Sequence, residues 1–155
     1  MEPGEIRPIA ICVLWDENKI FVGRYVDPST GEVFYRPLGG AIRFGERSRE
    51  CVVRELREEM GAEVKDLTFV GTLENMFTYD AKSGHEIVLI YQADFEDPGF
   101  YGAASVGCRD DDGEFLACWI PLADFETGQA ILYPEGLLDL LVSAEAAPGR
   151  VSDFA

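Results

Sequence analysis

Positive charge is scarce in this chain. Its 155 residues include 13 Lys and Arg against 29 Asp and Glu, which gives a formal net charge of −16 at pH 7. Proteins reach duplex nucleic acid and anionic membranes largely through Lys and Arg side chains. We therefore expect neither duplex nucleic acid nor a membrane to be a partner of this protein.

The sequence also lacks long hydrophobic runs and paired cysteines. No apolar stretch approaches the roughly 18 residues that a membrane-spanning helix requires, and the acidic start, MEPGE, has no basic flank of a signal peptide. The four cysteines have no paired metal-ligand spacing: Cys12, Cys51, Cys108 and Cys118. Scattered reduced thiols suit the cytoplasm, which is the expected compartment.

The overall composition is ordinary for a soluble globular protein. Hydrophobic residues make up 47% of the chain and charged residues 27%, and the length suits one domain with its own core. Neither an internal repeat nor a linker is visible. We predict a single domain over residues 1–145 and a poorly ordered tail over residues 146–155.

Hydrophobic patterning predicts alternating strands and two main helices. The predicted strands cover residues 9–15, 20–26, 33–38, 67–79, 86–95 and 115–120, and the fourth and fifth form a long hairpin. The predicted helices cover residues 48–60 and 134–144, whereas the segment 97–113, rich in Gly and Asp, is expected to be a mobile loop. Strands with a helix on each side imply a three-layer α/β/α arrangement.

The first predicted helix carries three glutamates on one edge. Glu55, Glu58 and Glu59 have the spacing i, i+3, i+4, so they project from one face beside an apolar stripe that can be buried. Like charges this close repel each other by a few tenths of a kcal/mol per pair. A run of acids alone usually marks a solvated helix face, but a hard divalent cation would explain the grouping.

The spacing around these glutamates is more specific than the charge itself. Residues 40–62 read GAIRFGERSRECVVRELREEMGA: Gly, five residues, Glu, seven residues, Arg-Glu-apolar, any residue, Glu-Glu, any residue, Gly-apolar. This pattern resembles the Nudix box. The matching residues are Gly40, Glu46, Arg54, Glu55, Leu56, Glu58, Glu59 and Gly61. Ala62 departs from the larger aliphatic residue that is more common in its slot, and Leu38 stands where many members have glycine.

The resemblance implies a Nudix-type α/β/α sandwich with a mixed β-sheet, in the α/β class. It also implies a hydrolase that cleaves the diphosphate bond of a nucleoside diphosphate linked to another group, with Mg²⁺ or Mn²⁺ as the cofactor. The implied metal ligands are Glu55, Glu58, Glu59 and the carbonyl of Gly39, and Glu58 and Glu59 are also counted as catalytic. Gly40 is implied to support the site, as are Glu46 and Arg54, which would pair the loop with the helix.

Members of this family often use a further acid from outside the box as a metal ligand or general base. Glu86, at the start of a predicted strand, is the preferred candidate for both roles, and Glu74 is its rival. An exposed edge carboxylate is the alternative interpretation of Glu86. His85 is the only histidine, and a lone histidine is more often structural than catalytic.

The sequence says less about the substrate, which we expect to be a small nucleoside diphosphate derivative. Arg36 could add positive potential near the site, and Phe77 and Tyr79 could stack on a base, although core packing is the simpler interpretation of both rings. Tyr79 lies at a distance from the box that resembles a subgroup acting on diadenosine polyphosphates. Thr78 stands where some ADP-ribose hydrolases carry proline, which makes ADP-ribose a weaker candidate.

Two alternatives to hydrolysis stay open at this stage. One is a non-catalytic Nudix-fold module that binds nucleotides or regulates, which usually goes with loss of the box glutamates. The other is an enzyme of the same fold with a different reaction, such as a diphosphate isomerase. A homodimer is an expectation by analogy with the family.

Overall fold

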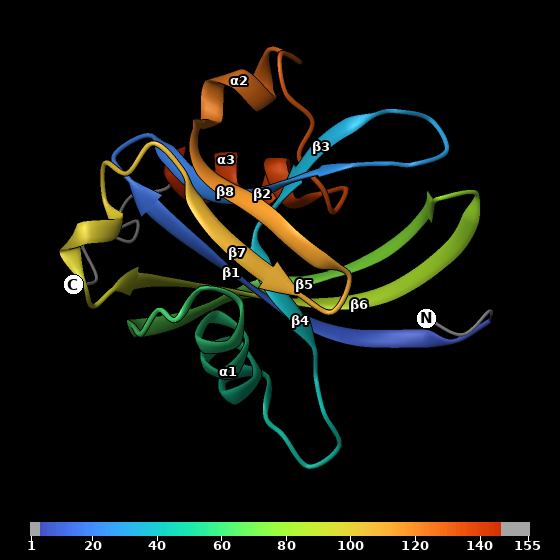
Figure 1. The fold of residues 1–155 in the computed structure, drawn as a ribbon, viewed down its shortest axis with the longest axis horizontal. Coiled ribbons are helices and arrows are strands. Elements are labelled where there is room, and N and C mark those ends of the chain that lie inside the picture. The colour runs from blue at the N-terminus through green and yellow to red at the C-terminus, as the bar shows by residue number, and fades with distance from the viewer. Residues whose placement is uncertain (1–3, 147–155) are drawn as a thin grey trace.

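The computed structural model describes residues 4–146 (Figure 1). The strands are β1 Ile6–Asp16, β2 Lys19–Val26, β3 Val33–Arg36, β4 Leu38–Ala41, β5 Val64–Tyr79, β6 Lys82–Phe95, β7 Val106–Asp110 and β8 Gly113–Pro121. The helices are α1 Ser48–Met60, α2 Leu122–Glu126, α3 Leu137–Ala146 and the short 3-10 helix η1 Pro98–Phe100.

The eight strands form one mixed sheet in the order β5-β6-β1-β2-β8-β7, with β3 paired to β2 and β4 paired to β1. Only the β1–β6 pair among them is parallel. Strand β1 is the hub, because its first half lies between β6 and β4 and its last residues pair with β2. The glycines of β4 are thereby fixed beside the centre of the sheet.

Each face of the sheet carries its own apolar core, which confirms the three-layer prediction. Ala10, Cys12 and Leu14 of β1 face α1, where they pack with Leu56. The alternating residues Ile9, Ile11 and Val13 face the other way and pack with Leu137 and Leu141 of α3. Figure 1 shows α1 on one side of the sheet and α2 and α3 on the other. Full burial of one such leucine contributes about 1.5–3 kcal/mol relative to exposure.

The predicted long hairpin is confirmed, and both of its strands are longer than expected. Strands β5 and β6 pair from Val64 with Phe95 to Tyr79 with Lys82. The turn between them is tight, because Asp80 and Ala81 both have positive φ, 51° and 60°. Two such residues in succession match the right-handed twist of the flanking strands.

Two predictions about strands and loops were wrong. The segment 33–38 is not one strand: Pro37, which has no backbone N–H, separates β3 on β2 from β4 on β1. The segment 97–113 is not a loop throughout, since it contains η1 and β7, and β7 pairs with β8 from Val106 to Asp110. Its Gly and Asp residues belong in part to the turn of this hairpin.

The helices after β8 also differ in part from prediction. Helix α2 was not predicted, because five residues carry almost no helical periodicity. Helix α3 begins at Leu137 rather than Pro134, which follows a cis peptide bond after Tyr133. The predicted tail is outside the described residues, except that Ala146 ends α3. None of the helices within residues 4–146 is long and apolar enough to cross a membrane.

Candidate active site

Helix α1 holds its glutamates through its own buried stripe. Val52 and Leu56 of the predicted apolar stripe are fully buried on the side that faces the sheet, as is Cys51. At the start of the helix, the backbone N–H of Arg47 donates to Glu50 Oε1 at 2.9 Å in a capping box. At the end, Gly61 adopts the left-handed conformation, with φ 67°, that terminates a helix. The rotation of α1 about its axis is therefore fixed.

Strand β4 lies directly against two of the three helix carboxylates. The backbone N–H of Gly39 donates to Glu59 Oε1 at 3.1 Å. A Cβ atom on Gly40 would lie 2.5 Å from Glu55 Oε1, so the Glu55 carboxylate occupies the space that a side chain would fill. Gly40 therefore leaves room for the Glu55 carboxylate, whereas the missing side chain of Gly39 allows close approach to the backbone of β1.

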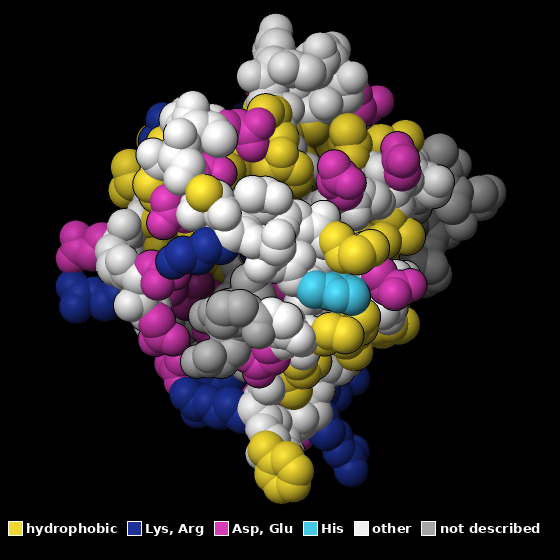
Figure 2. Space-filling view, turned by 90° about the vertical axis from the view of Figure 1, so that its right-hand side faces the viewer, with side chains coloured by type: hydrophobic (Ala, Val, Ile, Leu, Met, Phe, Trp, Pro, Cys, Tyr) yellow, Lys and Arg dark blue, Asp and Glu magenta, His cyan; other side chains and the backbone are white. Residues whose placement is uncertain are grey.

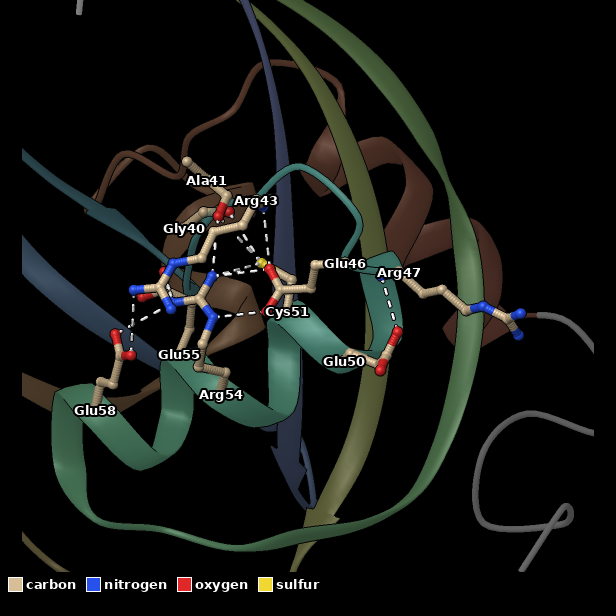
Figure 3. A network of polar contacts seen from close by, with 10 residues as sticks. All are labelled: Gly40, Ala41, Arg43, Glu46, Arg47, Glu50, Cys51, Arg54, Glu55 and Glu58. Atoms are coloured by element: carbon tan, nitrogen blue, oxygen red, sulfur yellow. Dashed lines mark hydrogen bonds and ion pairs between the residues drawn. The ribbon is translucent and has the colours of Figure 1, made fainter.

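A network of ion pairs around Arg54 covers the outer edge of this arrangement (Figure 3). Arg54 donates to both carboxylate oxygens of Glu46, at 2.7 and 2.9 Å, and to the carbonyl of Ala41 at 3.1 Å. It also contacts Glu55 at 3.0 Å and Glu58 at 3.2 Å. The expected ion pair between loop and helix is present, and Arg54 also ties α1 to β4.

Glu46 and Glu59 differ sharply in their electrostatic surroundings. The hydrogen bonds from Arg54 lower the pKa of Glu46 to about 2. Burial, followed by the charges of Glu55 and Asp110, raises the pKa of Glu59 to about 9. Its partners, the N–H of Gly39 and the more distant Arg36, offset this only in part. Around Glu59, burial and negative charge therefore outweigh the nearby positive charge.

The acids outside the helix fall on different sides of the β5–β6 hairpin. Glu86 is buried, with 3% exposure, and accepts contacts from Arg36 Nη2 at 3.5 Å and Asn75 Nδ2 at 3.3 Å. Glu74 is exposed and pairs with Ile87, one residue out of phase with the row that contains Glu86. Because successive side chains of a strand alternate between faces, only Glu86 shares the side of Arg36.

The two aromatic candidates, Phe77 and Tyr79, and the histidine, His85, differ in their contacts and in their exposure. The ring of Phe77 packs over Gly84, where an added Cβ would lie 2.3 Å from it. Tyr79 is 39% exposed and meets Phe34 edge-on at 6.0 Å between ring centroids. His85 is half-buried, and its Nε2 atom has no hydrogen-bond partner within residues 4–146. Tyr79 therefore keeps a ring surface that a ligand could reach.

Two residues near Glu59 were missed from the sequence, Tyr25 and Asp110. The charge of Asp110 raises the pKa values of both Glu59 and Tyr25, which places the three groups in one electrostatic neighbourhood. Asp110 was assigned to a loop, although Val106 and Cys108 alternate with Gly107 and Arg109 as in a strand and an Asp-Gly turn follows. Tyr25 has no sequence signal of its own.

The surface near these acids is hollowed. A cavity of about 590 Å³ lies between the end of α1 and the β7–β8 hairpin, lined among others by Glu58, Glu59 and Phe115. Figure 2 shows acidic side chains gathered around a hollow on the right-hand side of the Figure 1 view, with basic side chains at its edge. A small phosphorylated ligand has room in such a space.

The donor chemistry of the site suits a hard cation, although the side chains do not converge on one point. Among residues 4–146, no three His, Cys, Asp or Glu side chains form a ready-made metal cluster. The reason is visible in the contacts: Glu55 and Glu58 are turned toward Arg54, and Glu58 also meets Arg43 at 3.5 Å. A cation would compete with these arginines for exposed oxygen atoms, while the buried acid Glu59 lacks a full counter-charge.

Comparison with known proteins agrees with this arrangement. A sequence profile of the NUDIX domain matches residues 5–139. The NAD-capped RNA hydrolase NudC of Pseudomonas aeruginosa is 36% identical over 90 residues, which cover 58% of this chain and 30% of that protein. The RNA pyrophosphohydrolase of Cereibacter sphaeroides is 36% identical over 83 residues, 52% of this chain and 50% of that protein. The chain thus spans half or less of the length of these relatives.

Solved structures show the same fold at lower identity. A structure described as an ADP compounds hydrolase matches with a TM-score of 0.62 and 21% identity, over 97% of this chain and 78% of that one. A MutT NUDIX hydrolase from Burkholderia pseudomallei matches with a TM-score of 0.57 and 19% identity, over 77% and 85%. At these sequence identities, the structural similarity shows a shared fold.

Proposed function

The chain belongs to the Nudix family, and we propose that it is a divalent-metal-dependent hydrolase of a nucleoside diphosphate linked to another group. One observation carries the proposal. Glu59 is buried next to Glu55 and Asp110, and burial raises its pKa to about 9. Ionising a buried carboxyl group of this kind costs free energy. A bound metal ion supplies positive charge and thereby favours the ionised carboxylate.

The proposed ligands of Mg²⁺ or Mn²⁺ are the carboxylates of Glu55, Glu58, Glu59 and Glu86 and the carbonyl of Gly39. All five are oxygen donors, the type that hard divalent cations prefer. When bound, the metal would supply positive charge to phosphate oxygens and lower the pKa of an attacking water. Members of the family generally use divalent metals, and the donor set here fits that chemistry.

Residues of the chain are proposed to act as the general base, to supply positive charge and to hold the site in place. Glu86 is the proposed general base, and the contacts from Arg36 and Asn75 hold its carboxylate in place. Arg36 would add the local positive charge that a diphosphate needs in so acidic a protein. Glu46 and Arg54 would keep the loop after β4 fixed to α1, so that Glu55 stays beside Gly40.

The acidic balance of the chain favours a small substrate over an RNA end. The NudC and pyrophosphohydrolase relatives are named for RNA substrates, but a net charge of −16 would repel a long polyanion. A nucleoside diphosphate with one further group carries few charges, which Arg36 and the metal could offset. Tyr79, whose ring is partly exposed, is the proposed contact for the base, and Phe77, two residues earlier on the same face of β5, is a second proposed contact.

Other features of the proposal concern the whole protein. The four cysteines are free thiols, which supports a cytoplasmic location. We keep a single domain over residues 1–145 as our proposal, since the NUDIX match covers most of that range. A homodimer is proposed by analogy with the family alone.

A substrate panel tests the proposed function. Dinucleotides such as NAD, nucleotide sugars, nucleoside triphosphates and NAD-capped RNA would be incubated with Mg²⁺ or Mn²⁺, and products separated by chromatography. We expect cleavage of a diphosphate bond in a small substrate, abolished by EDTA, with slower cleavage of the capped RNA. Nucleotide binding without turnover would indicate a binding module instead, and an unsplit rearranged product would indicate an isomerase.

A further inference from the structure

The aromatic ring of Tyr25 is clamped on β2 next to the carboxylate site. It stacks on Phe34 of β3, with ring centroids 5.6 Å apart and planes at 22°, and on Phe115 of β8, at 5.1 Å and 30°. Stacking on both faces fixes the plane of the ring. The position of its hydroxyl group is therefore set by the sheet rather than by a free rotamer.

The hydroxyl group of Tyr25 lies back along its own strand, over Gly23. A Cβ atom on Gly23 would be 3.0 Å from the Tyr25 oxygen and 2.9 Å from the ring of Phe115. Gly23 pairs with Arg36, the residue that contacts Glu86. Phe115, which stacks on Tyr25, also lines the cavity that Glu59 lines. The phenol therefore lies close enough to Glu59 and Arg36 for both charges to act on it.

Burial, together with the charges around this phenol, keeps it protonated. Burial and then the negative charge of Glu59 raise the pKa of Tyr25 far above its ordinary value, and Arg36 offsets this only in part. The group is therefore a neutral hydrogen-bond donor and not a nucleophile. Within residues 4–146 the contacts of the Tyr25 side chain include its two stacked rings and the approach to Gly23, and the charges of Glu59, Arg36 and Asp110 act on it, so its hydroxyl can serve a ligand.

We propose that the Tyr25 hydroxyl donates a hydrogen bond to an oxygen atom of the bound diphosphate and so positions it between Arg36 and Glu59. The inference rests on the proposed function, since it assumes that a diphosphate binds here. It assigns a substrate-binding role to a residue outside the Nudix box and outside the acidic cluster. A phenol contributes a donor to the substrate without adding charge to the crowded carboxylates.

Tyr25→Phe tests this role because it removes the hydroxyl group and keeps both stacking contacts. With the best substrate of the panel, we expect kcat/KM to fall about tenfold, mainly through KM, as for a contact made with bound substrate. The melting temperature should not fall. The matched control is Tyr133→Phe, which removes a hydroxyl that contacts Glu32 and should change kcat/KM less than twofold.

A binding measurement separates this inference from the proposed function. Calorimetry would compare the parent and Tyr25→Phe with Mg²⁺ and ADP whose bridging oxygen is replaced by methylene, which cannot be cleaved there. Weaker binding to Tyr25→Phe supports the role even if no panel substrate is turned over. Equal binding and equal kcat/KM would overturn the role of Tyr25 and leave hydrolysis intact, whereas a parent that neither binds nor cleaves would overturn both proposals.

Discussion

The site has an outer edge, formed by Arg54 and Glu46, and an inner edge, formed by Glu59 and its neighbours. The carboxylates at these two edges have opposite electrostatic surroundings. At the outer edge, Glu46 accepts two hydrogen bonds from Arg54, and its pKa falls to about 2. At the inner edge, Glu59 accepts one backbone hydrogen bond, and its pKa rises to about 9. The first acid has its counter-charge inside the protein, and the second does not. The comparison separates a carboxylate that holds the fold together from one suited to bind an ion.

The largest effect should follow from Glu59→Gln. This change keeps the shape of the side chain but removes the charge that would hold a metal, so we expect kcat to fall by about a hundredfold or more with the fold intact. Product release with Mg²⁺ measures it. Glu126→Gln, an exposed residue at the end of α2, is the control and should match the parent. Unchanged turnover by Glu59→Gln would show that the metal assignment is wrong.

The second-largest effect tests whether Glu86, on β6, belongs to the active site together with Glu59. Glu86→Gln should lower kcat by at least tenfold, the scale of general acid–base work. The control is Glu74→Gln on the opposite side of the hairpin, where we expect less than a twofold change. A loss in Glu74→Gln and none in Glu86→Gln would reverse the roles of the two acids.

The third effect concerns the outer edge and is one of stability. Glu46→Gln should lower the free energy of unfolding at pH 7 by about 1 kcal/mol, because a charged hydrogen-bond partner of Arg54 becomes neutral. A lowered pKa stabilises the fold above the ordinary value of 4.5, and that contribution disappears as the pH falls toward about 2. Urea unfolding at pH 7, 4 and 2 should show the two proteins converging. A constant difference across this range would contradict the pKa assignment.

The smallest effect is expected at an ion pair of nearly the same length whose side chains are exposed. Arg109 and Glu114 meet at 2.8 Å with side chains 72% and 77% exposed, whereas Arg54 and Glu46 are 19% and 15% exposed. We expect Glu114→Gln to change the unfolding free energy by less than about 0.5 kcal/mol. A loss as large as that of Glu46→Gln would mean that distance, rather than burial, decides the strength of these pairs.

The outer edge and the helix were predictable from the sequence because their determinants are local. The buried stripe of α1 and the grouping of Glu55 with Glu59 both follow from residue spacing within one helix. The pairing of Glu46 with Arg54 followed from the resemblance. The hairpin was visible because its turn and its alternating strands are contiguous in the sequence.

The inner edge was only partly predictable because distant strands build it. Asp110 approaches Glu59 only once β7 pairs with β8, and Tyr25 is positioned by rings on β3 and β8. The split at Pro37 likewise depends on whether its neighbours pair with β1 or with β2, which spacing within one segment does not determine. Glu86 was proposed as the further acid from the sequence. Only the register of the hairpin shows that Glu86 and Glu74 lie on opposite sides of it.

The bare backbone at Gly40 limits how this protein could be redesigned. The Glu55 carboxylate already occupies the volume of a methyl group there, so any other residue must displace an acid before it disturbs the sheet. Variants with another residue at position 40 are therefore expected to fold but to lose activity, because Glu55 is displaced. Directed evolution toward new substrates would therefore do better to leave position 40 unchanged.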